Sequence, residues 1–348
     1  MKRNKSNKLI KILLGLILIT VIFVIANKAK SASYDKLANL DKAIFDQYKD
    51  FAKSDGDIWQ DYNLKDKDIV AVNGKFFGEA YLFTKDSNIK SIFAKKVDLP
   101  EDYGFSAYRI AKIHPKRYIS GNFNTHGKKY SILGKENIFF VKYNDDSVNK
   151  AFTSNHFLPF LAHEAFHYYM QDGWTNDTFR GLSYNDEELA LLDKEYQVLD
   201  KIDQELKGSS DKEKLISYAK EYIDVMDQRF ESTDAEKIKA EINEELVEGT
   251  AQYLTIKASQ IVDYDYGILY FDNTKDVRFK DIVPTIKAGQ VDQSIIGDRI
   301  VYDSGALLCE LLDSISTENW QEVLNNKKDE DIYFYQLIKS AVDRQGKF

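Results

Sequence analysis

The sequence predicts an α+β protein in which an apolar leader precedes a β-sheet and a mainly helical second half. Three observations support this prediction. Residues 12–26 form an uncharged apolar run, short β-branched and aromatic runs fill residues 69–143, and apolar residues then recur at helical spacing almost to the end. We expect a leader at 1–33, a helix with a mixed or antiparallel sheet at 34–150, and a helical part at 151–348.

Composition and charge exclude two classes of protein, non-specific nucleic-acid binders and disulfide-rich scaffolds. The 348 residues contain 48 Lys and Arg against 56 Asp and Glu, and the net charge is −8. Residues 1–30 hold seven basic residues and no acid, so the rest of the chain carries a net charge of −15. Such an acidic body does not bind nucleic acid non-specifically, because that affinity comes from Lys and Arg on phosphates. A single Cys excludes a disulfide scaffold.

The apolar run, which extends over residues 9–26, predicts export. Four basic residues precede it, a pattern that keeps the N-terminus cytoplasmic and places the body outside the cell. Its length fits a secretory signal or a single membrane anchor, and Ser31-Ala32-Ser33 offers a small-x-small cleavage site. We expect an extracellular protein, either secreted or anchored to the membrane; a buried N-terminal core helix is the alternative.

Two patterns describe the first half of the body. Residues 34–62 place apolar side chains at three- and four-residue steps, which predicts one amphipathic helix. From residue 69 onward, short apolar runs separated by Gly, Pro and Asn-Gly predict strands. The last of them, residues 137–143, is also a candidate edge strand for binding an extended peptide, or an ordinary core strand.

The second half predicts successive helices. One spans residues 186–207 and ends at Gly208. Ser210-x-x-Glu213 and Thr233-x-x-Glu236 predict capped starts for two more, the second of which runs to about Ile261. Another helix is expected at 303–314, followed by one or two shorter ones.

The segment 158–171 carries the motif His163-Glu164-x-x-His167. Residues four apart on a helix share a face about 6 Å apart, so both imidazoles can bind one ion while Glu164 reaches a water on that ion. Apolar residues surround the motif on nearly every side, which predicts a buried helix. A metal would be the partner that such buried polar groups need; the alternative is two hydrogen-bonded core histidines beside a surface Glu.

A zinc site needs at least one more protein ligand. His114, His126 and His156 are scattered, and Cys309 lies in an apolar helical stretch, where we expect it in the core. The best remaining ligand is Glu248.

Glu248 is embedded in Leu-Val-Glu-Gly-Thr-Ala-Gln-Tyr-Leu, where Gly249 and a following Ala allow another helix to approach closely. A carboxylate at such a position needs a neutralising partner. Glu244 and Glu245 could simply be solvated, and either Gln252 or Glu244 could orient a histidine ligand.

Together these segments resemble the gluzincin class of zinc metallopeptidases, in which a helical HExxH gives two ligands and a Glu on a later helix, often within E-G-x-A, gives the third. Residues 298–308 resemble the Tyr-x-x-Gly segment of the aminopeptidase-like members. The resemblance implies Zn²⁺ held by His163, His167 and Glu248, with Glu164 as general base and Tyr302 as oxyanion donor.

The chain also departs from that pattern. The Gly-x-Met-Glu-Asn motif of the aminopeptidases is absent, and Ser304 stands where they usually have Lys. Eighty residues separate His167 from Glu248, a gap that helices at about 186–230 could fill as an insertion. The resemblance covers about 155–175, 240–256 and 298–312.

These features predict a zinc-dependent metallopeptidase that acts on a peptide or protein substrate outside the cell. Its leader would contact the membrane if it is not cleaved. Two other functions stay open: a catalytically silent surface binding or scaffold protein on a peptidase-like fold, and a zinc amidase that acts on a non-peptide substrate such as cell-wall material.

Overall fold

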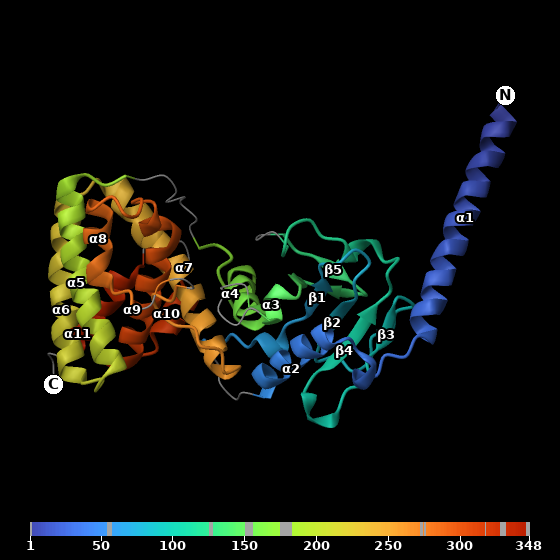
Figure 1. Ribbon diagram of the computed structural model, residues 1–348, viewed down its shortest axis with the longest axis horizontal. Coiled ribbons are helices and arrows are strands. Elements are labelled where there is room, and N and C mark those ends of the chain that lie inside the picture. The colour runs from blue at the N-terminus through green and yellow to red at the C-terminus, as the bar shows by residue number, and fades with distance from the viewer. Residues whose placement is uncertain are drawn as a thin grey trace. The chain divides into compact units, whose positions relative to one another are not determined.

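The computed structural model describes residues 2–53, 58–124, 128–149, 156–174, 183–271, 274, 276–316, 318–327 and 332–345 (Figure 1). The chain divides into two compact units. The sheet unit comprises Met1–Gly56 and Asn63–Leu161, and the helical unit comprises Asp57–Tyr62 and Ala162–Phe348.

A five-stranded mixed sheet forms the centre of the sheet unit, in the order β3-β4-β2-β1-β7. β1 and β7 are parallel, with Ile69 beside Phe139, and the other neighbours are antiparallel. The expected α+β class, with a mixed sheet before the helices, is therefore confirmed. The strands of this unit are β1 (Ile69–Asn73), β2 (Ala80–Thr84), β3 (Ala94–Lys96), β4 (Ser106–Ile110), β5 (Ser131–Ile132), β6 (Lys135–Glu136) and β7 (Phe139–Tyr143).

The helix α2 (Asn39–Lys53) packs on one face of this sheet. Phe45 makes edge contacts with Tyr81 and Phe83, at ring-centroid distances of 5.0 and 4.8 Å. The predicted helix over 34–62 was too long. Tyr34–Lys36 is a separate 3₁₀ turn that ends at an extended Leu37, and residues 58–62 are not helical. Other short helices of the unit are the 3₁₀ turns Leu64–Asp66, Glu101–Tyr103 and Pro115–Arg117, and α3 (Asp146–Asn149).

The leader forms α1 (Lys2–Ala29), which extends away from the sheet (Figure 1). Within it, Asn7–Ala29 is long and apolar enough to cross a membrane, and an apolar stretch of 18 residues in this span is not buried in the protein. This helix has the properties of an export signal or a membrane anchor.

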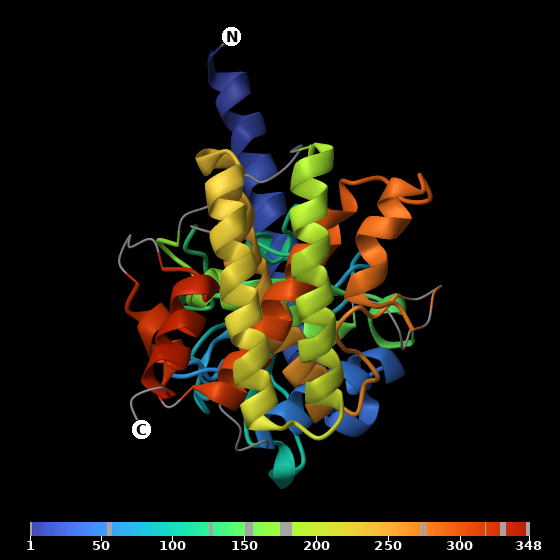
Figure 2. The same ribbon diagram turned by 90° about the vertical axis from the view of Figure 1, so that its left-hand side faces the viewer.

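Nine described helical segments form the helical unit or lead into it. They are α4 (Phe157–Tyr169), α5 (Asp186–Lys207), α6 (Lys212–Ser232), α7 (Ala235–Ile261), α8 (Phe279–Lys287), a π-helical turn (Ile296–Ile300), α9 (Val301–Ile315), α10 (Trp320–Asn325) and α11 (Phe334–Gln345). The division between the units falls within α4, between Leu161 and Ala162. α5 and α6 lie side by side (Figure 2), and α7 packs against α9.

The caps of α6 and α7 lie one residue later than predicted. Asp211 and Asp234, rather than Ser210 and Thr233, accept hydrogen bonds from the free backbone N–H groups of the first turn. Ser210 has a left-handed φ of 52°, and Thr233 is the C-terminal cap of α6. The capping box that does form is at the start of α5, between Asn185 and Glu188.

A buried ion cluster ties α5 and α6 to α7. The guanidinium of Arg229, 2% exposed, pairs with Glu195 and donates to Glu241 at 2.7 Å. Tyr184 donates to the same Glu241 carboxylate at 2.8 Å. The helices at 186–230 are therefore joined to α7 by buried charges as well as by apolar packing, as parts of one helical unit.

Candidate metal centre

α4 carries His163, Glu164 and His167 on one helix, as predicted. Its neighbouring side chains Ala162, Ala165 and Phe166 are fully buried. The two histidines are partly exposed, with 13% and 16% of their side chains accessible. The helix is thus fixed by apolar packing on one side while it presents both imidazoles to the surface of the unit.

α7 brings Glu248 to these histidines. Its Oε2 lies 3.3 Å from Nε2 of His163 and 3.4 Å from Nε2 of His167. The two Nε2 atoms are 3.1 Å apart. His163 and Glu248, which are 85 residues apart along the chain, therefore meet His167 at one point.

The size of this triangle fits a zinc ion. Bonds of about 2.0–2.2 Å to a tetrahedral zinc place neighbouring ligand atoms about 3.3 Å apart. The three measured separations of 3.1, 3.3 and 3.4 Å match that spacing. His163, His167 and Glu248 could therefore hold a zinc ion through two nitrogens and one oxygen and leave a fourth position open.

Thr255 fixes the tautomer of His163. The Thr255 hydroxyl donates to the backbone carbonyl of Ala251 at 3.0 Å, so its oxygen accepts from Nδ1–H of His163, also at 3.0 Å. In the neutral ring the proton is then on Nδ1 and the lone pair is on Nε2. That lone pair points toward Glu248.

Gln171 fixes the tautomer of His167 in the same way. Its amide nitrogen donates to the carbonyl of Val247 at 2.9 Å and to the hydroxyl of Thr250 at 2.8 Å, which turns the amide oxygen toward Nδ1 of His167. Two Nε2 lone pairs and a carboxylate oxygen therefore face one another. Such an arrangement is repulsive unless a cation or a proton lies between them, and hydrogen bonding of this kind is typical of metal-binding histidines.

The pKa shifts of His167 and Glu248 also indicate that a positive charge is favoured between these side chains. Burial alone would lower the pKa of His167, but the negative charge of Glu248 and a hydrogen bond to it raise that pKa to about 9. Burial would raise the pKa of Glu248, but the charge of His167 and hydrogen bonds to both histidines hold it far below its usual range. The protein without metal thus keeps Glu248 ionised and retains a proton at the position that a metal would take.

α9 places Tyr302 beside the cluster. Its ring stacks over that of His163, with 6.2 Å between centroids and 8° between planes. Burial raises the pKa of Tyr302, as do the negative charges of Glu248 and Glu244 and a hydrogen bond to Glu248. The hydroxyl is therefore protonated at neutral pH and can donate.

Of the two residues expected to orient a histidine, Gln252 does not contact one: it donates to Tyr266 at 3.0 Å and to Asp303 at 3.3 Å. The expectation for Glu244 stays a prediction. Glu245 is not solvated but buried, and it accepts a hydrogen bond from Ser304.

The residues that do contact the histidines, Gln171 and Thr255, were missed. Gln171 follows His167 by one helical turn and Thr255 follows Glu248 by two turns. Helical spacing was therefore the available signal for both.

The other candidates lie elsewhere. His114 and His156 belong to the sheet unit, His126 lies outside the described residues, and Cys309 is buried in α9, as expected.

β7 is at the edge of the five-stranded sheet, but part of its outer backbone is already hydrogen-bonded. The backbone N–H of Lys142 donates to Asn122 at 2.7 Å, and that of Phe140 donates to the side chain of Asn124 at 2.8 Å. These two donors are already occupied, so they do not serve an extended peptide.

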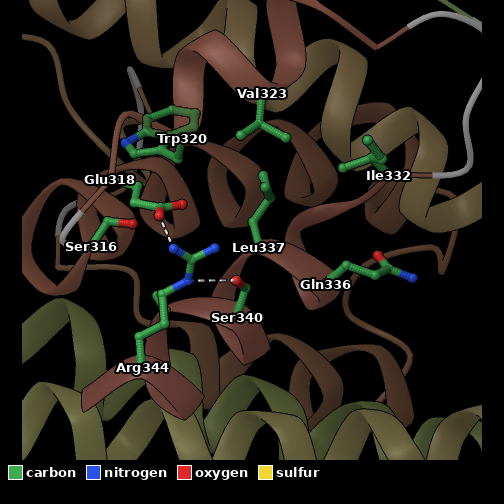
Figure 3. A pocket seen from close by; sticks show the side chains of 10 residues that line it. Ser316, Glu318, Trp320, Val323, Ile332, Gln336, Leu337, Ser340 and Arg344 are labelled. Carbon is green, nitrogen blue, oxygen red and sulfur yellow. Dashed lines mark hydrogen bonds and ion pairs between the residues drawn. The ribbon is translucent and has the colours of Figure 1, made fainter. Parts of the chain in front are cut away.

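A hollow of about 260 Å³ lies between α10 and α11 and includes none of the five predicted site residues. Trp320, Val323 and Leu337 line it, and Arg344 pairs with Glu318 and contacts Ser340 at its rim (Figure 3). Its charged groups already neutralise each other, so the metal cluster remains the better candidate for chemistry.

No protein-family model, no curated protein and no solved structure matches this chain.

Proposed function

We propose that this chain is a zinc-dependent metallopeptidase of the gluzincin type. The convergence of two Nε2 lone pairs and one carboxylate oxygen at 3.1–3.4 Å supports this function most directly. The tautomers set by Thr255 and Gln171 add to it, because core histidines without a metal do not need both lone pairs on the same side.

Each residue has a role that follows from its position. A zinc ion held by His163, His167 and Glu248 would lower the pKa of a water to about 7 and polarise the scissile carbonyl. Glu164, next to His163 on α4, takes the proton of the attacking water and returns it to the leaving amine. Tyr302 donates its hydroxyl hydrogen to the oxygen that becomes negative, an interaction worth about 2.7–4 kcal/mol.

The proposed location is the extracellular side of a membrane. The basic residues before the apolar run keep the N-terminus in the cytoplasm, so the two folded units emerge on the other side. A peptide or protein in that compartment is the proposed substrate.

Metal content and turnover test the proposal together. The full chain in detergent should contain about one zinc by elemental mass spectrometry and hydrolyse a mixed peptide library. Glu248→Ala should lose most of the metal, whereas Glu236→Ala, an exposed residue of the same helix, should keep it. Glu164→Gln should bind zinc normally and lose turnover.

The alternative functions correspond to defined results. A chain that binds zinc but hydrolyses no peptide in the library would favour the scaffold function. Hydrolysis of cell-wall amides but not of peptides would favour the amidase. Equal turnover in Glu164→Gln would exclude the mechanism, and a wild-type chain that takes up no zinc would exclude the proposal.

A further inference from the structure

The segment that follows the apolar span is built into the sheet unit. Arg109 on β4, only 2% exposed, reaches the C-terminal end of α1. Its guanidinium donates to the backbone oxygens of Asn27, Lys30 and Ser31 at 2.7–2.8 Å and to the Asn27 side chain at 3.0 Å. Among the described residues, these are the hydrogen bonds of the Arg109 guanidinium, and all of them go to the leader.

Residues of the leader also make contacts with the sheet unit. Asn27 donates to the carbonyl of Phe93 at 3.4 Å, and the Lys28 ammonium donates to the carbonyls of Ser91 and Ala94. Lys30 pairs with Glu79 at 2.7 Å, and this pair helps to keep the pKa of Glu79 below its usual value despite burial. The leader and the sheet unit therefore each donate hydrogen bonds to the other at this junction.

The small-x-small cleavage site is part of the same structure. Ala32 is 5% exposed, and its carbonyl accepts from the backbone N–H of Asp98 at 2.7 Å. Ser33 forms a parallel bridge with Asp98, whose carbonyl accepts from Tyr34 at 2.9 Å. The backbone at Ala32, Ser33 and Tyr34 is therefore hydrogen-bonded to Asp98, just after the end of β3.

Removal of the leader would damage the fold. A cut after Ser33 deletes every acceptor of the Arg109 guanidinium and uncovers a side chain that is only 2% exposed in the intact chain, so the sheet unit loses this set of charge-assisted hydrogen bonds. The carbonyls at the C-terminal end of a helix are also the favoured partners of a cation. An ordinary cleaved signal peptide has no such partner in the mature protein.

We propose that the leader is not removed, and that α1 remains in the lipid bilayer as an anchor whose end is fixed to the sheet unit by Arg109. Residues 27–33 then form a structured junction rather than a flexible stalk. The protein would act as a membrane-bound rather than a released protein. This inference stands on the sheet unit alone and does not depend on the proposed activity.

The N-terminus of the exported protein is the direct test. The full chain is expressed in an export-competent host, membranes are washed with carbonate, and tryptic peptides are identified by mass spectrometry. Retention predicts protein in the washed membranes and the peptide of residues 31–36, which begins after Lys30 and ends at Lys36. Soluble protein that starts within residues 32–34 would overturn the proposal.

A variant tests the role of Arg109. Arg109→Met keeps the bulk of the side chain and removes its donors, so trypsin should cut at Lys28 and Lys30 and release the body from detergent-solubilised protein about tenfold faster than in the wild type. Lys95→Met, at the paired position on β3, should behave as the wild type. Release of Arg109→Met at the wild-type rate would overturn the role of Arg109. If this variant does not fold, the N-terminal test on the wild type still decides whether the leader is retained.

Discussion

Gly249 on α7 and Gly305 on α9 meet so closely that neither can carry a side chain without movement of a helix. A β-carbon on Gly249 would lie 2.4 Å from Cα of Gly305, and one on Gly305 would lie 2.3 Å from the carbonyl oxygen of Glu245. Gly249 follows Glu248 directly, and Gly305 follows Tyr302 by three residues. This helix crossing therefore sets the distance between the third candidate ligand and the candidate oxyanion donor.

Gly305→Ala should separate α7 from α9. Because backbone rather than a flexible side chain blocks the new methyl group, we expect a loss of about 2 kcal/mol or more in the free energy of unfolding. Zinc content should persist, since the three candidate ligands are on α4 and α7, while turnover should fall because Tyr302 moves. Urea unfolding and a peptide assay measure the two effects.

The matched control for this substitution is Gly267→Ala, where a β-carbon would meet nothing within 4 Å. It should change neither stability nor turnover. A Gly305→Ala protein as stable and active as Gly267→Ala would show that the crossing does not need glycine.

The sequence predicted the long elements well and their ends less well. α7 and α9 were expected close to where they lie, because the spacing of their apolar residues is regular over three turns or more. The caps of α6 and α7 were misplaced by one residue, since Ser-Asp and Thr-Asp each offer two adjacent capping side chains. Only the local backbone, such as the left-handed φ of Ser210, decides between them.

Thr255→Val tests the support of His163. Valine has nearly the shape of threonine but cannot accept from Nδ1–H, so the ring is free to rotate or to change tautomer. We expect zinc affinity to fall by about 10- to 100-fold, measured by competition with a chelating indicator.

Thr285→Val is the control, because Thr285 also donates its hydroxyl to the carbonyl four residues earlier but touches no histidine. Equal zinc affinity in the two variants would contradict the assignment of Thr255 as a positioning residue.

The candidate site could be predicted only as far as local motifs reach. His163, Glu164 and His167 share one helix, so their spacing alone brings the two imidazoles together. Glu248 was singled out by its apolar surroundings, and the structure places it beside both histidines. The burial of Glu245 depends on the contact of α7 with α9, which no pattern within α7 reveals.

Glu245 carries the last prediction, which concerns pH. Burial, together with the negative charges of Glu195 and Glu241, raises its pKa from 4.5 to about 8, although the hydrogen bond from Ser304 and the charge of Arg229 oppose the shift. The folded protein therefore prefers the neutral carboxyl. Its contribution to stability is complete below about pH 4.5 and is lost as the pH rises toward 8, at about 1.4 kcal/mol per pH unit.

Glu245→Gln should remove this dependence, because an amide keeps the shape and the polar contact without an ionisation. We expect the free energy of unfolding of the wild type to decrease relative to that of Glu245→Gln between pH 5 and 8, measured by urea unfolding at each pH. Glu231→Gln, an exposed residue near the end of α6, should follow the wild type. Parallel pH profiles for the wild type and Glu245→Gln would mean that Glu245 is already ionised in the folded protein, with Arg229 as the cation that tolerates it.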